Sequence, residues 1–231
     1  MLAHSIAPSD TRTAFAKARC PAAPVDHFVN VAGLAGLVAT SFRYRKDEEI
    51  FGEDESTEYV YQIVRGAVRT YKLLADGRRQ IGSFHLPGDI FGLEYGPHHR
   101  LTAEAIVDTE VRLIQRRSLE SAANADVQVA RTLWNVTAGE LRHAEEHMLL
   151  LGCKTAMERV AAFLLEMDRR LAAAAMVALP MCRRDIGDYL GLTLETVSRA
   201  LSQLHDQGVL DFSGARQIVI RNRQRLRDIN A

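Results

Sequence analysis

The feature that most constrains the fold is a long helical stretch, starting after residue 117, that carries one regular stripe of side chains. Between residues 127 and 151, apolar or small residues recur at alternating steps of three and four, a heptad spacing sustained over more than three heptads. Such a helix packs lengthwise against a partner. The stripe can pack on the same chain or form a parallel coiled coil between two copies, and we predict the dimer. Its members are Val127, Ala130, Trp134, Thr137, Leu141, Ala144, Met148 and Leu151.

The residues before this helix predict β-strands. From about residue 38 to residue 115, short apolar or alternating runs are separated by Gly, Asp and Pro. The dipeptide Asp76-Gly77 tolerates the positive φ of a tight turn, so residues 70–74 and 78–83 are predicted to pair as a hairpin. Consecutive strands with no helix between them indicate an antiparallel barrel or sandwich. The predicted strands cover residues 58–64, 67–74, 79–86, 102–107 and 111–114.

The overall charge argues against one class of function. The chain has 231 residues with 29 Lys+Arg and 29 Asp+Glu, and this net charge of zero is not that of a polybasic protein that binds polyanions by bulk attraction. The sum hides an asymmetry, because residues 181–231 have a net charge of +2 and residues 1–180 have one of −2. So small an excess supports nucleic-acid binding only alongside a motif.

Targeting signals and cysteine content narrow the class further. No run approaches the roughly 18 apolar residues that a membrane span requires. Charged residues are scattered through the first 20 positions, where a signal peptide has an apolar core, so we expect a cytoplasmic protein without a membrane partner. Three cysteines with no CxxC pair are too few for a disulfide framework, a zinc site or an iron–sulfur cluster.

Residues 183–205 have the pattern of a helix-turn-helix. Residues 183–190 show helical apolar spacing, residues 191–193 break it, and Thr193 is the predicted N-cap of a second helix over residues 194–205. Two short helices joined by a Gly-containing turn place the second helix in the major groove of DNA. The alternative is the solvated face of a helical bundle. We favour the DNA-binding motif because a predicted β-hairpin wing follows over residues 208–221.

The outer face of the second helix presents side chains that can read bases. Arg199 can donate two hydrogen bonds to guanine, and Glu195 can accept one from cytosine N4. Ser198 can bond either way, and Leu194 can meet a thymine methyl group. Other residues are expected to contact the phosphate backbone and set the register without reading sequence. These are Arg183, Arg184, Thr193 and Thr196.

Two groups of motifs resemble the CRP/FNR superfamily. Glu195-Thr196-Val197-Ser198-Arg199 lies within a pattern similar to the superfamily's DNA-binding domain: Ile186-Gly187, Leu190-Gly191, Leu204, Gly208 and Ile218. Upstream, a second group resembles its cyclic-nucleotide-binding-type barrel: Gly66, Asp76-Gly77-Arg78, Gln80-Ile81 and Pro87-Gly88-Asp89-Ile90-Phe91-Gly92. The resemblance covers about residues 38–223, nearly the whole chain.

The resemblance implies an α+β fold in four parts. These are a flexible N-terminal arm (1–24), a cyclic-nucleotide-binding-like β-barrel or jelly roll (25–117), a dimerisation helix (118–152) and a winged helix-turn-helix domain (153–231). It further implies a homodimer bound to double-stranded DNA at a palindrome with TTGA-like half-sites, with Glu195 and Arg199 on the central C·G pair. The expected activity is transcription activation through RNA polymerase. A repressor and a small-ligand-responsive regulator are the alternatives.

The barrel departs from the cyclic-nucleotide-binding members of the superfamily. In those members a Gly-Glu holds the ribose and an Arg before Ser/Thr-Ala holds the phosphate, whereas here Glu94 is displaced by one position and Leu101 precedes Thr102. A shift of one residue in a strand turns a side chain to the opposite face. The N-terminal arm has one cysteine where the oxygen-sensing branch binds a cluster. We therefore predict that the protein has no cofactor, and it resembles the FixK-type branch. We also predict that His85, His98 and His99 lie on the surface.

Cys182 is the predicted site of regulation. It precedes two arginines at the expected start of a helix, where nearby cations and the helix dipole favour the thiolate. Oxidation to the sulfinate would add negative charge beside DNA phosphates and weaken binding. The alternative is an inert thiol.

One motif suggests an enzyme. His143-Ala144-Glu145-Glu146-His147 matches HxxEH, in which two histidines one helical turn apart hold zinc and the glutamate activates water. The heptad stripe passes through this segment, and no third-ligand motif accompanies it. We therefore predict no enzymatic activity and keep a zinc hydrolase as a remote alternative.

Overall fold

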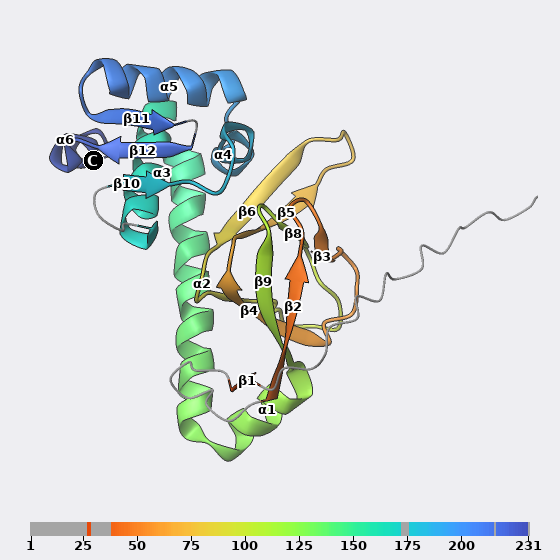
Figure 1. Ribbon diagram of the computed structural model, residues 1–231. Coiled ribbons are helices and arrows are strands. Elements are labelled where there is room, and N and C mark those ends of the chain that lie inside the picture. Colours follow the sequence, from red (N-terminus) through yellow and green to blue (C-terminus); the bar gives the residue numbers. More distant parts are fainter. Residues whose placement is uncertain (1–26, 29–37, 172–175, 215, 231) are drawn as a thin grey trace, which may run out of the picture.

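The computed structural model describes residues 27–28, 38–171, 176–214 and 216–230, so the predicted arm over residues 1–24 lies outside the described residues. Figure 1 shows a β-barrel, a long helix running beside it, and a smaller C-terminal unit of helices and a short sheet. This is the α+β architecture predicted from the sequence. Within the described residues, no helix is both long and apolar enough to cross a membrane.

The barrel consists of two antiparallel sheets. Its strands are β1 (His27–Phe28), β2 (Val38–Tyr44), β3 (Glu49–Phe51), β4 (Tyr59–Arg65), β5 (Val68–Leu73), β6 (Arg79–His85), β7 (Ile90–Phe91), β8 (Thr102–Ala105) and β9 (Thr109–Gln115). One sheet has the order β1-β2-β9-β4-β7 and the other β3-β8-β5-β6. The five predicted strands correspond to β4, β5, β6, β8 and β9. The strands β3 and β7 have three and two residues, too few to show an alternating pattern.

The predicted hairpin is confirmed. Strands β5 and β6 pair from Val68 with His85 to Leu73 with Arg79. In the turn, the Asp76 carboxylate accepts a hydrogen bond from the backbone N–H of Arg78 at 3.0 Å, and Gly77 has a φ of 83°. The Asp-Gly dipeptide therefore closes the turn through the positive φ that was expected.

Aromatic rings fill the space between the two sheets. The buried rings of Phe51, Tyr61 and Phe91 have centroids 5.2–6.1 Å apart. His99 stacks on Phe51 with centroids 3.6 Å apart, and His85 stacks on Phe91 at 4.9 Å. The prediction of surface positions for these two histidines is wrong, because both belong to the aromatic core and are buried.

Buried His85 gives stability a defined pH dependence. Burial, followed by the charges of Arg170 and His143, lowers the pKa of His85 to about 3. An unfolded histidine titrates near 6.5, so only the unfolded state binds this proton between pH 6.5 and pH 3. The free energy of unfolding should therefore decrease as the pH falls through this window. From pH 7 to pH 5 the loss due to His85 is about 2 kcal/mol.

Urea denaturation of His85→Gln and the parent at both pH values measures this contribution. Glutamine does not titrate and can still reach the Thr70 hydroxyl, which lies 3.2 Å from Nε2 of His85. His98→Gln is the matched control, because His98 is exposed. Equal acid sensitivity of the parent and His85→Gln would contradict the assignment.

Three helices follow the barrel: α1 (Arg116–Ala125), α2 (Val127–Cys153) and α3 (Ala156–Leu171). The sequence predicts one helical stretch interrupted at residues 152–153, whereas the structure has one break at residue 126 and another at residues 154–155. Asp126 is extended and its carboxylate accepts a hydrogen bond from the Gln128 N–H at 2.8 Å, which starts α2 anew. At the other end, the Thr155 N–H donates to Glu158 Oε2 at 2.7 Å and the Glu158 N–H donates to Thr155 Oγ1 at 3.4 Å, a capping box that starts α3.

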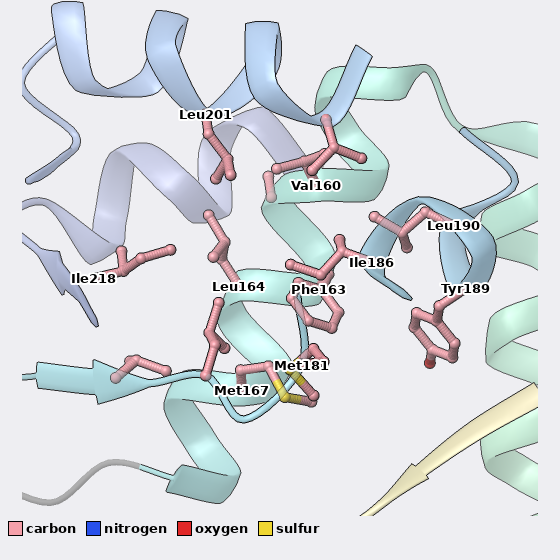
Figure 2. Packing of buried hydrophobic residues seen from close by; sticks show 14 of the residues in the cluster. Val160, Phe163, Leu164, Met167, Met181, Ile186, Tyr189, Leu190, Leu201 and Ile218 are labelled. Carbon is pink, nitrogen blue, oxygen red and sulfur yellow. The ribbon is translucent and has the colours of Figure 1, made fainter. Parts of the chain in front are cut away.

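The C-terminal unit is built around α3. It contains β10 (Met176–Ala178), α4 (Arg183–Leu190), α5 (Leu194–Asp206), β11 (Leu210–Gly214), β12 (Gln217–Ile220) and α6 (Arg223–Asn230). Figure 2 shows Val160, Phe163, Leu164 and Met167 of α3 pointing into one apolar cluster with side chains of α4 and α5. The predicted wing is the β11–β12 hairpin. The sequence does not predict α6. It does not predict β10 either, because β10 is stabilised by pairing with the distant β12.

Candidate DNA-binding interface

The turn between α4 and α5 depends on two glycines. Gly191 ends α4 with a φ of 63°, in the left-handed region that favours glycine. A Cβ on Gly187 would lie only 2.6 Å from the carbonyl oxygen of Leu192, so α4 approaches the turn too closely for a side chain. Thr193 then caps α5 by accepting a hydrogen bond from the Thr196 N–H at 3.2 Å. The predicted helix-turn-helix and its N-cap are confirmed.

The four residues predicted to read bases lie on the outer side of α5. Leu194, Glu195 and Arg199 are exposed, and Ser198 is half-buried. The other side of the helix is buried, and Figure 2 shows Leu201 pointing from it into the apolar cluster. The structure thus brings together a guanidinium, a carboxylate, a hydroxyl and an apolar side chain, whose donors and acceptors match base edges.

The two arginines at the start of α4 have different surroundings. Arg184 is exposed, as a phosphate contact requires. Arg183 is half-buried, its Nη1 donates to Ser198 Oγ at 3.4 Å, and its guanidinium lies 5.6 Å from the ring centroid of Phe212 in the wing. Arg183 therefore connects α4, α5 and β11 and orients Ser198. Its contact with phosphate remains a prediction.

The wing adds a cation that sequence reasoning missed. Arg216 is exposed in the turn between β11 and β12, and its Nη1 donates to the carbonyl oxygen of Pro180 at 3.2 Å. An arginine at this position can contact a phosphate next to the major groove. A basic residue inside the predicted wing turn was the available signal.

Cys182 is exposed at the N-cap of α4. Its Sγ and its backbone N–H both donate to Asp185 Oδ2, each at 3.1 Å. Burial raises the pKa of Asp185, but the hydrogen bonds from Cys182 and the charges of Arg69 and Arg79 outweigh burial and hold this pKa below its ordinary value. The Cys182 thiol is thus exposed beside the arginines that begin α4, with the Asp185 carboxylate as its hydrogen-bond partner.

The heptad stripe lies on the open face of α2. Val127, Trp134, Leu141 and Met148 are spaced by seven residues, and their exposed fractions are 65%, 74%, 61% and 65%. Thr137 and Ala144 are also exposed, whereas Ala130 and Leu151 are half-buried. The opposite face of α2, at residues 129, 133 and 136, packs on the barrel. Among the residues that the structure describes, the four large apolar side chains of the stripe are thus left mostly uncovered.

The HxxEH residues have other partners. His147 Nε2 lies 2.8 Å from the carbonyl oxygen of Tyr189, and their rings stack with centroids 4.1 Å apart. His143 Nε2 lies 3.4 Å from the Tyr189 hydroxyl, and its Nδ1 lies 3.8 Å from a Glu166 carboxylate oxygen. Both histidines therefore join α2 to the C-terminal unit. No three His, Cys, Asp or Glu side chains among the described residues are arranged to hold a metal ion.

The barrel residues do not fit a cyclic nucleotide. Glu94, which corresponds to the displaced ribose acceptor, has one oxygen 2.6 Å from His99 Nδ1 and accepts a hydrogen bond from the Arg100 N–H at 3.3 Å. The side chain of Arg100 is exposed. With aromatic rings filling the space between the sheets, neither the acceptor nor the cation for such a ligand is in place.

Comparison with known proteins finds family matches for two regions of the chain. Residues 41–126 match the cyclic nucleotide-binding domain family, and residues 158–229 match the Crp-like helix-turn-helix domain family. The nitrogen fixation regulation protein FixK of Azorhizobium caulinodans is 42% identical over 211 residues, covering 89% of this chain and 85% of that protein. FixK of Rhizobium meliloti is 38% identical over 218 residues, covering 94% and 98%.

A solved structure supports the same family relationship. FixK2 from Bradyrhizobium japonicum superposes with a TM-score of 0.83 at 79% identity, over 84% of this chain and 98% of that chain. The two family matches cover the barrel with α1 and the C-terminal unit, in the order found here and on either side of α2. This chain is therefore a FixK-like member of the CRP/FNR family of transcription regulators, with a cyclic nucleotide-binding-type barrel and a Crp-type helix-turn-helix.

Proposed function

We propose that this protein is a cytoplasmic, homodimeric activator that binds a palindrome with TTGA-like half-sites. It works without a cyclic nucleotide or iron–sulfur cofactor. The observation that carries the proposal is the outer face of α5, where Leu194, Glu195 and Arg199 are exposed on a Crp-type helix-turn-helix. Each good base contact discriminates by about 1–3 kcal/mol, so a few such side chains suffice for specificity.

The dimer is supported by the open face of α2. Burial of an exposed Leu or Met side chain is favourable by about 1.5–3 kcal/mol, and one copy presents four large apolar side chains at heptad spacing. A parallel pair of these helices buries both stripes at once. The pair holds two α5 helices over successive major grooves, about 34–36 Å apart on one side of the DNA.

We assign the base contacts from family resemblance and chemistry. Glu195 and Arg199 contact the central C·G pair of each half-site, and Leu194 and Ser198 lie near the flanking A·T pairs. Arg184 contacts phosphate together with Arg183, Thr193 and Thr196. Thr193 and Thr196 lie at the start of α5, where backbone N–H groups also favour an anion.

Regulation is proposed at Cys182 rather than in the barrel. One molecule of hydrogen peroxide oxidises an exposed thiol to the sulfenic acid, a second oxidises that to the sulfinic acid, and each peroxide is reduced to water. The sulfinate places a negative charge at the start of α4, close to Arg183 and Arg184, and therefore repels DNA phosphates. The lack of fit between the barrel and a cyclic nucleotide supports control without an effector.

Transcription activation through RNA polymerase is the proposed output, and it rests on the resemblance to the family. A repressor, or a regulator with a different barrel ligand, is the alternative. We propose no enzymatic activity, because the FixK proteins that this chain resembles are named regulators. The contacts of His143 and His147 with Tyr189 also give the HxxEH segment a structural role.

Binding-site selection from random DNA duplexes tests the proposal. Selection is run on the parent, with and without cAMP or cGMP, and with and without peroxide. We expect a TTGA-like palindrome that is unchanged by cyclic nucleotide and lost after peroxide treatment. Recovery of random sequence from the untreated parent would contradict sequence-specific binding, and recovery only with a nucleotide would contradict effector independence.

The oxidation step is tested with two serine variants. Cys182→Ser should keep its DNA affinity in peroxide, because no sulfinate can form at the start of α4. Cys153→Ser is the matched control, since Cys153 is the other exposed cysteine among the described residues and lies at the end of α2. It should remain as sensitive as the parent. Equal loss of binding by Cys182→Ser and the parent would exclude Cys182 as the sensor.

A further inference from the structure

Charged side chains join the β5–β6 hairpin of the barrel to α4. Arg79 of β6 donates from Nε and Nη2 to Asp188 Oδ2 at 2.9 and 2.7 Å, and from Nη2 to Asp185 Oδ1 at 2.6 Å. Arg69 of β5 donates from Nη1 to the same Asp185 oxygen at 3.2 Å. We call these four residues the barrel–α4 cluster. Both arginines come from the β3-β8-β5-β6 sheet of the barrel, and both carboxylates come from α4, the first helix of the DNA-binding motif.

The barrel–α4 cluster is held firmly on the barrel side. The side chains of Arg69 and Asp185 are only 9% and 4% exposed. Arg69 also pairs with Asp47 at 3.3 Å and with Glu104. Arg79 lies over the ring of Tyr71, 5.4 Å from its centroid. Because their other partners fix them, the two arginines present a rigid pair of donors to α4.

The barrel–α4 cluster acts together with other contacts between the same parts, since the Tyr189 ring of α4 packs on Phe84 of β6 with centroids 5.1 Å apart and Gln80 of β6 donates to the Tyr189 carbonyl oxygen at 3.2 Å. The helices α2 and α3 are separated by Lys154 and Thr155, and this break connects the long helix to the C-terminal unit. A rotation at the break would move α5 relative to the stripe on α2. The cluster opposes that rotation, because it fixes α4 on the barrel while the helix-turn-helix fixes α5 on α4.

We infer that Arg69, Arg79, Asp185 and Asp188 are positioning residues that set the orientation of α5 for binding to a palindrome. The inference rests on the proposed dimeric DNA-binding function. A dimer reads two half-sites at once only when both reading helices keep a fixed place relative to the dimer helix. With the barrel–α4 cluster formed, this orientation is built into the chain and requires no ligand in the barrel. Because buried ion pairs contribute little net stability, we assign this cluster to fixing one geometry rather than to stabilising the fold.

Asp188→Asn and Arg79→Gln separate positioning from simple electrostatics. Both side chains are partly exposed, so both variants are expected to fold. Asp188→Asn removes a negative charge from the DNA-binding unit, and by electrostatics alone it would tighten DNA binding. Positioning predicts the opposite sign, a loss of affinity for the selected palindrome of about tenfold, as is typical of a broken coupled pair. Affinity for random duplex should not fall.

Fluorescence anisotropy on the palindrome and on random duplex, run as a double-mutant cycle, gives the result. The double variant should bind no more weakly than either single variant, and Asp188→Glu should restore affinity because it keeps the carboxylate. Arg78→Gln is the matched control, because Arg78 lies next to Arg79 but pairs with Asp76 in the exposed turn. It should bind like the parent.

The outcomes distinguish the two proposals. A parent protein with no preference for any duplex contradicts the proposed function. A parent that binds specifically, while Asp188→Asn binds as tightly or more tightly, overturns the positioning inference alone. Independent, additive losses in the double variant, or no recovery in Asp188→Glu, overturn it as well. Thermal unfolding of each variant confirms that the compared proteins are folded.

Discussion

Replacing Arg199 with alanine should reduce affinity for the selected palindrome by about 100-fold or more, because a guanine contact worth about 1–3 kcal/mol is lost in each of two half-sites. The side chain is exposed on the outer face of α5, so its removal leaves the buried side of the helix intact. Selectivity at the corresponding base pair should relax. Anisotropy titrations on duplexes that vary only at this base pair measure both effects.

Arg184→Ala is the matched control for Arg199→Ala. Arg184 is also an exposed arginine of the helix-turn-helix, but it is assigned to phosphate. Its replacement should weaken binding to specific and random DNA by a similar factor and reduce the salt dependence of binding. An equal loss on specific and random DNA for Arg199→Ala would show that Arg199 does not read a base.

Replacing Leu141 with glutamate should dissociate the dimer and, with it, tight DNA binding. Leu141 is 61% exposed in the middle of the heptad stripe, where a parallel partner would bury it. The change removes about 1.5–3 kcal/mol of apolar burial from each copy and places two carboxylates in the interface. We therefore expect dimerisation to weaken by about 1,000-fold or more. Sedimentation velocity and anisotropy measure the two consequences.

Leu149→Glu provides the matched control. Leu149 is 59% exposed on the same helix but lies outside the heptad positions. The same substitution there adds the same charge to α2 without entering the predicted interface, so the variant should stay dimeric. A Leu141→Glu protein that sediments as a dimer at micromolar concentration would exclude this stripe as the interface.

Several parts of the fold could be predicted because their signals are local. The Asp76-Gly77 turn, the Thr193 cap and the break at Gly191 each depend on residues within a few positions of one another. The helix-turn-helix and the wing were found for the same reason. The short strands β3 and β7 were missed because their pairing partners, rather than their own residues, specify them.

The candidate site was only partly predictable. The exposed face of α5 follows from helical spacing, which separates Arg199 from the buried positions. The contacts of Arg183 do not, because Ser198 and Phe212 lie 15 and more positions away and come to it through the helix-turn-helix and the wing. The burial of His85 and His99 could not be predicted from the sequence either, since polar residues near turns are exposed in most proteins.

The sequence by itself determined the order of barrel, long helix and helix-turn-helix. It also determined the heptad stripe on the long helix and the side chains that α5 presents to DNA. Only the tertiary structure decided which face of α2 stays open, that aromatic rings fill the barrel, and that Arg79 meets Asp188. The physical reason is distance along the chain. Helical and strand periodicities arise between near neighbours, whereas the ion pair between the barrel and α4 joins residues 109 positions apart.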